Sequence, residues 1–130
     1  GLERDRKSRD YLYGRLLAVA DCLESFALSD VEKNRPTNAA RLMKRFADHP
    51  FSTWRNIYLQ LNPYRLRLGR KIKKYEIAEK EIMDLFEAEE FKQDTPLTGE
   101  FLLGFHAQRG ELMKKTEKKA DETTEQEAEK

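Results

Sequence analysis

The sequence predicts a single all-α domain, a bundle of about five helices followed by a charged tail. Apolar residues recur at spacings of three and four, which is the helical period, and no long stretch alternates with period two as a strand would. Prolines and glycines are few, four and six of 130 residues, and the prolines fall at plausible breaks between the periodic segments. We therefore expect a bundle domain over residues 1–113 and a disordered tail over residues 114–130, where no core-forming residue larger than alanine occurs.

The first helix is expected after Ser8, a residue type that caps helices, and a polar loop at residues 29–36 should follow it. Gly14 in its middle costs about 1 kcal/mol relative to alanine, which is tolerable where another backbone comes close. The apolar stripe of this helix is spaced by fours and threes and comprises Leu12, Leu16, Val19, Leu23 and Phe26.

The second helix is expected over residues 38–48, capped by Thr37 or Asn38. Its buried side should consist of Ala39, Met43, Phe46 and Ala47.

Pro50 fits the first turn of a third helix, which Asn62-Pro63 should break or kink. A long fourth helix should then run to Phe91, with a basic start and an acidic finish. That polarity is the reverse of what the helix dipole favours, so local stability does not explain it.

A turn at residues 92–96 should precede a fifth helix, with Thr95 as its cap and Pro96 at its first position. Gly104 within this helix again permits close approach of another backbone. The residues expected in the core are Leu16, Leu23, Phe46, Trp54, Ile57, Leu85 and Phe105.

Charge is distributed unevenly along the chain, although the net charge is only +1. Residues 1–74 carry 17 Lys/Arg and 8 Asp/Glu, whereas residues 75–113 carry 3 and 10. A basic half beside an acidic half is consistent with one surface for a polyanion and another for a basic partner. Two solvated faces of one bundle would give the same pattern.

The sequence contains no motif for catalysis, for a cofactor or for a metal. Phosphate-loop and dinucleotide glycine patterns, the zinc motif HExxH and cysteine pairs are all absent. His49 and His106 lie 57 positions apart, and Cys22 flanks an apolar stripe, where a small buried hydrophobe is the expected role. Because no catalytic motif is present, we expect that the protein is not an enzyme. A single cysteine, which cannot form an internal disulfide, and the lack of an apolar run near the ~20 residues of a membrane span predict a cytoplasmic protein.

Two groups of cations are candidates for contacting nucleic acid. Arg41, Lys44 and Arg45 share one side of the second helix, opposite its apolar side, and are called the cationic stripe. The basic segment, residues 65–74, has six cations in ten residues and no acidic residue within it. Such density attracts phosphate without reading sequence, although a wet helix face has a similar composition. Its cations are Arg65, Arg67, Arg70, Lys71, Lys73 and Lys74.

Four stretches resemble one known region, in its order and spacing: RDYLYGRLLAVAD, TNAARLMKRFADHPFSTW, LNPYRLRL and PLTGEFLLGFHAQRGEL. The sequence is similar there to the C-terminal helical region of the type I-C CRISPR Cascade large subunit, over Arg9 to Leu112. In that subtype the same region is also made as a separate small subunit, and a chain holding this region looks like that subunit.

The resemblance implies a helical bundle along a crRNA-guided surveillance complex, without catalytic residues or cofactors. Its implied partners are the Cascade backbone and large subunits, crRNA and target DNA, with further copies of itself possible. There it would help to hold the R-loop, especially the displaced non-target strand, while guide pairing reads sequence. In the last matching stretch, His106, Gln108 and Arg109 are expected either to contact a partner or to tie the last helix to its neighbours. The alternative function is a structural adaptor, whose acidic helix at residues 75–91 docks basic proteins without touching nucleic acid.

Overall fold

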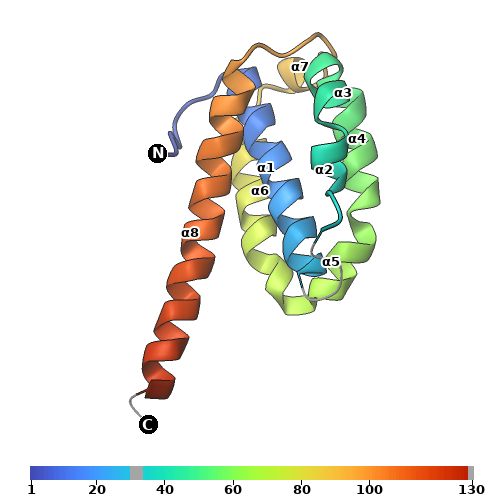
Figure 1. The fold of residues 1–130 in the computed structure, drawn as a ribbon. Coiled ribbons are helices and arrows are strands. Elements are labelled where there is room, and N and C mark those ends of the chain that lie inside the picture. Colours follow the sequence, from blue (N-terminus) through green and yellow to red (C-terminus); the bar gives the residue numbers. More distant parts are fainter. Residues whose placement is uncertain (30–33, 129–130) are drawn as a thin grey trace.

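All regular secondary structure in the computed structural model is helical within the described residues, 1–29 and 34–128, with side chains described through Lys114 (Figure 1). This confirms the predicted all-α class. Residues 30–33 of the predicted loop and 129–130 of the predicted tail lie outside the described residues. The elements are α1 (Arg9–Leu28), α2 (Asn38–Arg41), α3 (Met43–Asp48), α4 (Pro50–Gln60), α5 (Asn62–Leu68), the 3-10 helix η1 (Gly69–Ile72), α6 (Lys73–Leu85), α7 (Ala88–Phe91) and α8 (Glu100–Ala128).

Helix α1 is the centre of the bundle. It packs against α8 along most of its described length, and α6, α5, α2 and α4 also contact it (Figure 1). Every residue from Tyr11 to Glu24 is consequently buried, including three charged ones, so the burial of α1 extends well beyond the predicted stripe. Phe26, at the end of that stripe, is only partly buried.

Two glycines allow the backbones of α1 and α8 to touch. A Cβ atom built on Gly104 would lie 2.1 Å from the carbonyl oxygen of Tyr11, and one built on Gly14 would lie 1.8 Å from that of Phe101. No side chain fits at either distance, because the obstructing atoms are backbone. The prediction that both glycines permit close approach is confirmed.

The structure changes the predicted extents of the second and fourth helices. The second helix divides at Leu42 (φ −101°, ψ 10°) into α2 and α3, and Thr37 caps α2 by accepting a hydrogen bond from the backbone N–H of Ala40. The long fourth helix is wrong: Gly69 has φ +56°, a conformation that favours glycine, so the chain passes from α5 into η1 and α6. Helix α6 then ends at Leu85, before the short α7.

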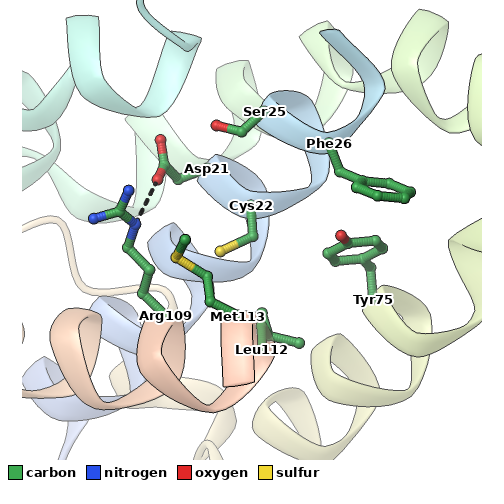
Figure 2. Close-up of a pocket in the computed structure, with 8 residues that line it drawn as sticks. All are labelled: Asp21, Cys22, Ser25, Phe26, Tyr75, Arg109, Leu112 and Met113. Atoms are coloured by element: carbon green, nitrogen blue, oxygen red, sulfur yellow. Dashed lines mark ion pairs between the residues drawn. The ribbon is translucent and has the colours of Figure 1, made fainter. Parts of the chain in front are cut away.

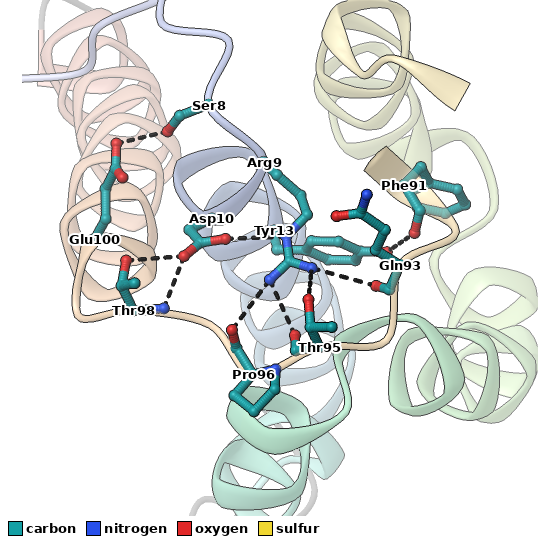
Figure 3. Close-up of polar contacts among 10 residues, drawn as sticks. All are labelled: Ser8, Arg9, Asp10, Tyr13, Phe91, Gln93, Thr95, Pro96, Thr98 and Glu100. Carbon is teal, nitrogen blue, oxygen red and sulfur yellow. Dashed lines mark hydrogen bonds and ion pairs between the residues drawn. The ribbon is translucent and has the colours of Figure 1, made fainter. Parts of the chain in front are cut away.

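The fifth helix starts at Glu100 rather than at Pro96, because α1 holds residues 92–98 as a turn (Figure 3). Arg9 donates from Nη1 to Thr95 Oγ1 (2.7 Å) and from Nη2 to the carbonyl oxygen of Thr95 (2.9 Å). The Asp10 carboxylate accepts from the backbone N–H and the hydroxyl of Thr98. Ser8, expected to cap α1, makes no capping hydrogen bond and donates instead to Glu100 Oε1.

These hydrogen bonds outweigh the effect of burial on Asp10. Burial alone raises the pKa of this carboxyl group, but the two hydrogen bonds from Thr98 and the ion pair with Arg9 bring the pKa below its ordinary value. The turn is therefore held by an ionised carboxylate.

The core matches the prediction except at one position. Leu85 is only partly buried and packs against the core, whereas the other six predicted residues are buried. Tyr13 is the centre of an aromatic cluster with Phe46, Phe86 and Phe91, and its hydroxyl donates to the carbonyl oxygen of Phe91.

Helix α8 continues to Ala128 and projects beyond the rest of the bundle (Figure 1). That residues 114–130 form a disordered tail stays a prediction. That the tail is dispensable for folding stays a prediction. None of the helices in the described part of the chain is long and apolar enough to cross a membrane.

Candidate nucleic-acid interface

The basic segment occupies α5, η1 and the start of α6, and most of its cations face solvent. Arg67, Arg70, Lys71 and Lys73 are exposed, while Arg65 and Lys74 are partly buried. Arg70 and Lys73 form no ion pair with any described residue. The reversal at Gly69 places the cations of α5 and those of η1 at the same end of the bundle (Figure 1).

Arg65 is neutralised by an acidic residue that lies outside the basic segment. Its Nη2 donates to both carboxylate oxygens of Glu79, at 2.8 and 2.9 Å, and its guanidinium lies 5.0 Å from the ring centroid of Tyr58. Burial raises the pKa of Glu79 above its ordinary value, even though the charge and hydrogen bond of Arg65 act in the opposite direction. The charge of Arg65 is therefore paired with Glu79 inside the protein.

Three other cations of the segment are held close to the end of α1. Arg67 Nη1 donates to the carbonyl oxygen of Ala27 at 3.5 Å, at the C-terminus of α1. The Nζ atoms of Lys71 and Lys74 lie 5.9 and 5.6 Å from the ring centroid of Phe26. These contacts position the side chains, and Arg67 and Lys71 are exposed residues.

The cationic stripe is exposed but lies on two elements, Arg41 on α2 and Lys44 and Arg45 on α3. Arg41 donates to Asn38 Oδ1 at 2.7 Å. In the structure α2 and α3 run away from the end of the bundle where α5 and η1 lie (Figure 1). The stripe and the basic segment therefore form two separate surfaces.

The three residues of the last matching stretch differ in exposure. His106 is exposed, Gln108 is 2% exposed, and Arg109 is half-exposed with its Nε 3.5 Å from Asp21 Oδ2 of α1. Gln108 and Arg109 thus both join α8 to α1. Whether any of the three also contacts a partner stays a prediction.

Sequence reasoning missed a buried polar network that connects α1, α6, α8 and the N-terminal segment. Arg15 is fully buried; its Nε donates to Gln108 Oε1 (2.8 Å) and its Nη2 to Glu81 Oε1 (3.1 Å). Arg4 bridges Glu81 and Glu111 from the outside. Burial raises the pKa of Glu81, but its bonds to Arg4 and Arg15 outweigh burial, so the pKa lies below its ordinary value.

The residues considered for chemistry have structural surroundings. Cys22 is buried, as expected, and burial raises the pKa of its thiol to about 11, so the nucleophilic thiolate is scarce at neutral pH. His49 lies 3.8 Å from an Asp94 carboxylate oxygen and is exposed. No group of His, Cys, Asp and Glu side chains suited to a metal ion occurs among the described residues.

The fold and this surface define a small helical bundle that is tied together by internal ion pairs and exposes cations at one end. The family model described as CRISPR-associated protein (Cas_Csd1) matches residues 1–113. This chain therefore belongs to that family of CRISPR-associated proteins. No curated protein matches it.

Proposed function

We propose that this chain is a non-catalytic small-subunit module of a type I-C crRNA-guided surveillance complex in the cytoplasm. In this proposal it contacts the backbone subunits and holds the displaced non-target strand of the R-loop during antiviral defence. Membership of a CRISPR-associated family supports a role beside other Cas components. The resemblance to the type I-C large subunit supports the particular complex.

The exposed cations of the basic segment carry the nucleic-acid part of this proposal. Arg67, Arg70, Lys71 and Lys73 are exposed on neighbouring turns. Lys73 and Lys74 begin α6, where the helix dipole disfavours cations, so the stability of α6 does not account for them. A displaced single strand needs no base-specific contact, and phosphate-binding cations suffice to hold it.

The decisive experiment removes three charges from this segment in the assembled complex. Arg70→Ala, Lys71→Ala and Lys74→Ala together should shorten R-loop lifetime while the guide-pairing rules stay unchanged. Because each single-strand phosphate contact contributes a slope of about −0.7 in log K against log salt, the loss of three should flatten the slope by about 2.

The matched control variant also loses three positive charges, but from outside the basic segment. Arg55, Lys80 and Lys92 are exposed cations outside both candidate surfaces, and their joint replacement by Ala should leave R-loop lifetime unchanged. If the two triple variants assemble and behave alike, the basic segment is a solvated face and the proposal fails. Nucleic-acid turnover by the chain itself would contradict its non-catalytic part.

The exposed acidic side of α6 and α7 favours the second candidate, an adaptor that binds only proteins. Glu76 and Asp84 on α6, Glu87 just before α7 and Glu89 on α7 are exposed. The apolar residues Leu59 and Leu66 are 73% and 76% exposed on α4 and α5. Under this alternative, Glu87→Gln with Glu89→Gln should weaken incorporation into the complex, and the triple variant of the basic segment should have no effect on DNA retention.

A further inference from the structure

A pocket of about 220 Å³ opens between α1, α6 and α8, next to the basic segment (Figure 2). The rings of Phe26 and Tyr75 form one side, and Cys22, Leu112 and Met113 lie across from them. The ion pair between Arg109 and Asp21 stands at another edge. Drug-sized ligands fill roughly 300–1,000 Å³, so this pocket suits a single ring system.

The surroundings of the pocket are cationic although its lining is largely apolar. The Nζ of Lys71 lies 5.9 Å from the Phe26 ring centroid, and the Nζ of Lys74 lies 5.6 Å from that centroid and 5.0 Å from the Tyr75 centroid. At the α8 side the guanidinium of Arg109 is balanced by its ion pair with Asp21, so the two lysines supply the excess positive charge. A ligand that combines a flat apolar group with negative charge complements this arrangement better than a neutral apolar side chain does.

We infer that the pocket receives one unstacked base of a single-stranded nucleic acid whose phosphates lie along the basic segment. This inference rests on the proposed function and adds a contact to the base. Stacking on aromatic side chains is tolerant of sequence, because every base has a π-face. The pocket therefore anchors the strand at one nucleotide without selecting its sequence.

The test compares two fluorescently labelled oligonucleotides with equal charge, one of thymidines and one of abasic residues, bound to the full chain. Because stacking of a base contributes roughly tenfold in affinity, the thymidine strand should bind about tenfold more tightly. Cys22→Met lengthens a side chain that lines the pocket and should remove this difference, leaving the affinity for the abasic strand unchanged. Cys22→Ala is the matched control and should keep the difference.

A second measurement avoids any dependence on how the variants fold. Cys22 is the only cysteine in the sequence. Because burial raises the pKa of its thiol to about 11, alkylation by N-ethylmaleimide is slow at neutral pH and is followed at alkaline pH, where it reports on the pocket of the unaltered chain. The thymidine strand should slow alkylation, and the abasic strand should not.

Equal affinity for the two strands, equal alkylation rates with them, or no binding of either strand would overturn the inference. Loss of protein assembly in Cys22→Met with unchanged oligonucleotide binding would also overturn it, in favour of an acidic peptide with an apolar anchor. The proposed function is judged separately by R-loop lifetime in the triple variant of the basic segment. If the pocket shows no preference for the thymidine strand but the triple variant still shortens R-loop lifetime, the inference about the pocket fails and the proposed function stands.

Discussion

Two regions of the molecule use charged side chains in opposite ways. One is the contact between α1 and α8, and the other is the basic segment. In the first, Arg15 is enclosed with Gln108 and Glu81, and its charge joins helices inside the bundle. In the second, Arg70 and Lys73 face solvent without an ion pair to any described residue. Abundant charge in this chain therefore does not by itself mark a binding surface. The candidate surface is where exposed cations form no ion pair with other described residues of the bundle.

The largest effect is expected at the aromatic part of the α1–α8 contact. Phe105→Ala should lower the free energy of unfolding by about 3–5 kcal/mol, because it removes a large buried ring and leaves a cavity. Leu103→Ala on the same helix removes a side chain that is 58% exposed and should change stability by less than about 0.5 kcal/mol. Denaturant titration measures both, and similar losses would contradict the assigned faces of α8.

The backbone contact of α1 and α8 at Gly14 and Gly104 should give the next largest effect on stability. Gly104→Ala forces a Cβ against the backbone of Tyr11 and should destabilise the fold by about 1–3 kcal/mol or more, as overpacking does. Gly110→Ala has open space around its Cβ and should stabilise α8 by up to about 1 kcal/mol through helix propensity. A lower melting temperature for Gly104→Ala and a higher one for Gly110→Ala would support the backbone contact. Higher melting temperatures for both variants would exclude it.

Acidification should weaken the internal ion pairs. The pKa values of Asp10 and Glu81 are lower in the folded chain than ordinarily, so their contribution to stability is present above a pH of about 4 and is lost as pH falls below it. The raised pKa of Glu79 acts in the opposite direction and offsets part of this loss. Melting temperatures at pH 7, 4 and 3 should fall progressively. The fall should be smaller for Asp10→Asn than for Glu89→Gln, which changes an exposed residue of α7.

Arg109 should show the smallest effect on stability. It is half-exposed and its ion pair with Asp21 spans 3.5 Å, so Arg109→Ala should cost about 0.2–1 kcal/mol. Chemical denaturation and incorporation into the complex are measured together. Unchanged stability with reduced incorporation would show that Arg109 contacts a partner instead of tying α8 to α1.

Local signals predicted the parts of the fold that depend on neighbours in sequence. Pro50 and Asn62-Pro63 gave the limits of α4, and Gly14 and Gly104 predicted a close backbone approach. The chain reversal at Gly69 was missed, because the helical period of the surrounding residues continues through it.

The candidate site was harder to predict, because its charges pair over long separations. Arg65 meets Glu79 fourteen positions away, beyond the reach of helical i to i+4 reasoning, so the local sequence suggested an unpaired cation. The burial of Arg15 depends on α6 and α8 covering α1 from two sides. An amphipathic stripe on α1 alone does not contain that information.

The backbone contact at Gly14 and Gly104 also fixes the register of α8 on α1. Where two backbones touch, one helix cannot slide along the other without driving a side chain into a carbonyl group. Beyond Gly104, the bonds of Gln108 to Arg15 and of Arg109 to Asp21 hold α8 against α1. Because Leu112 and Met113 follow on the same helix and line the pocket, the shape of the pocket depends on the contacts that hold the bundle together.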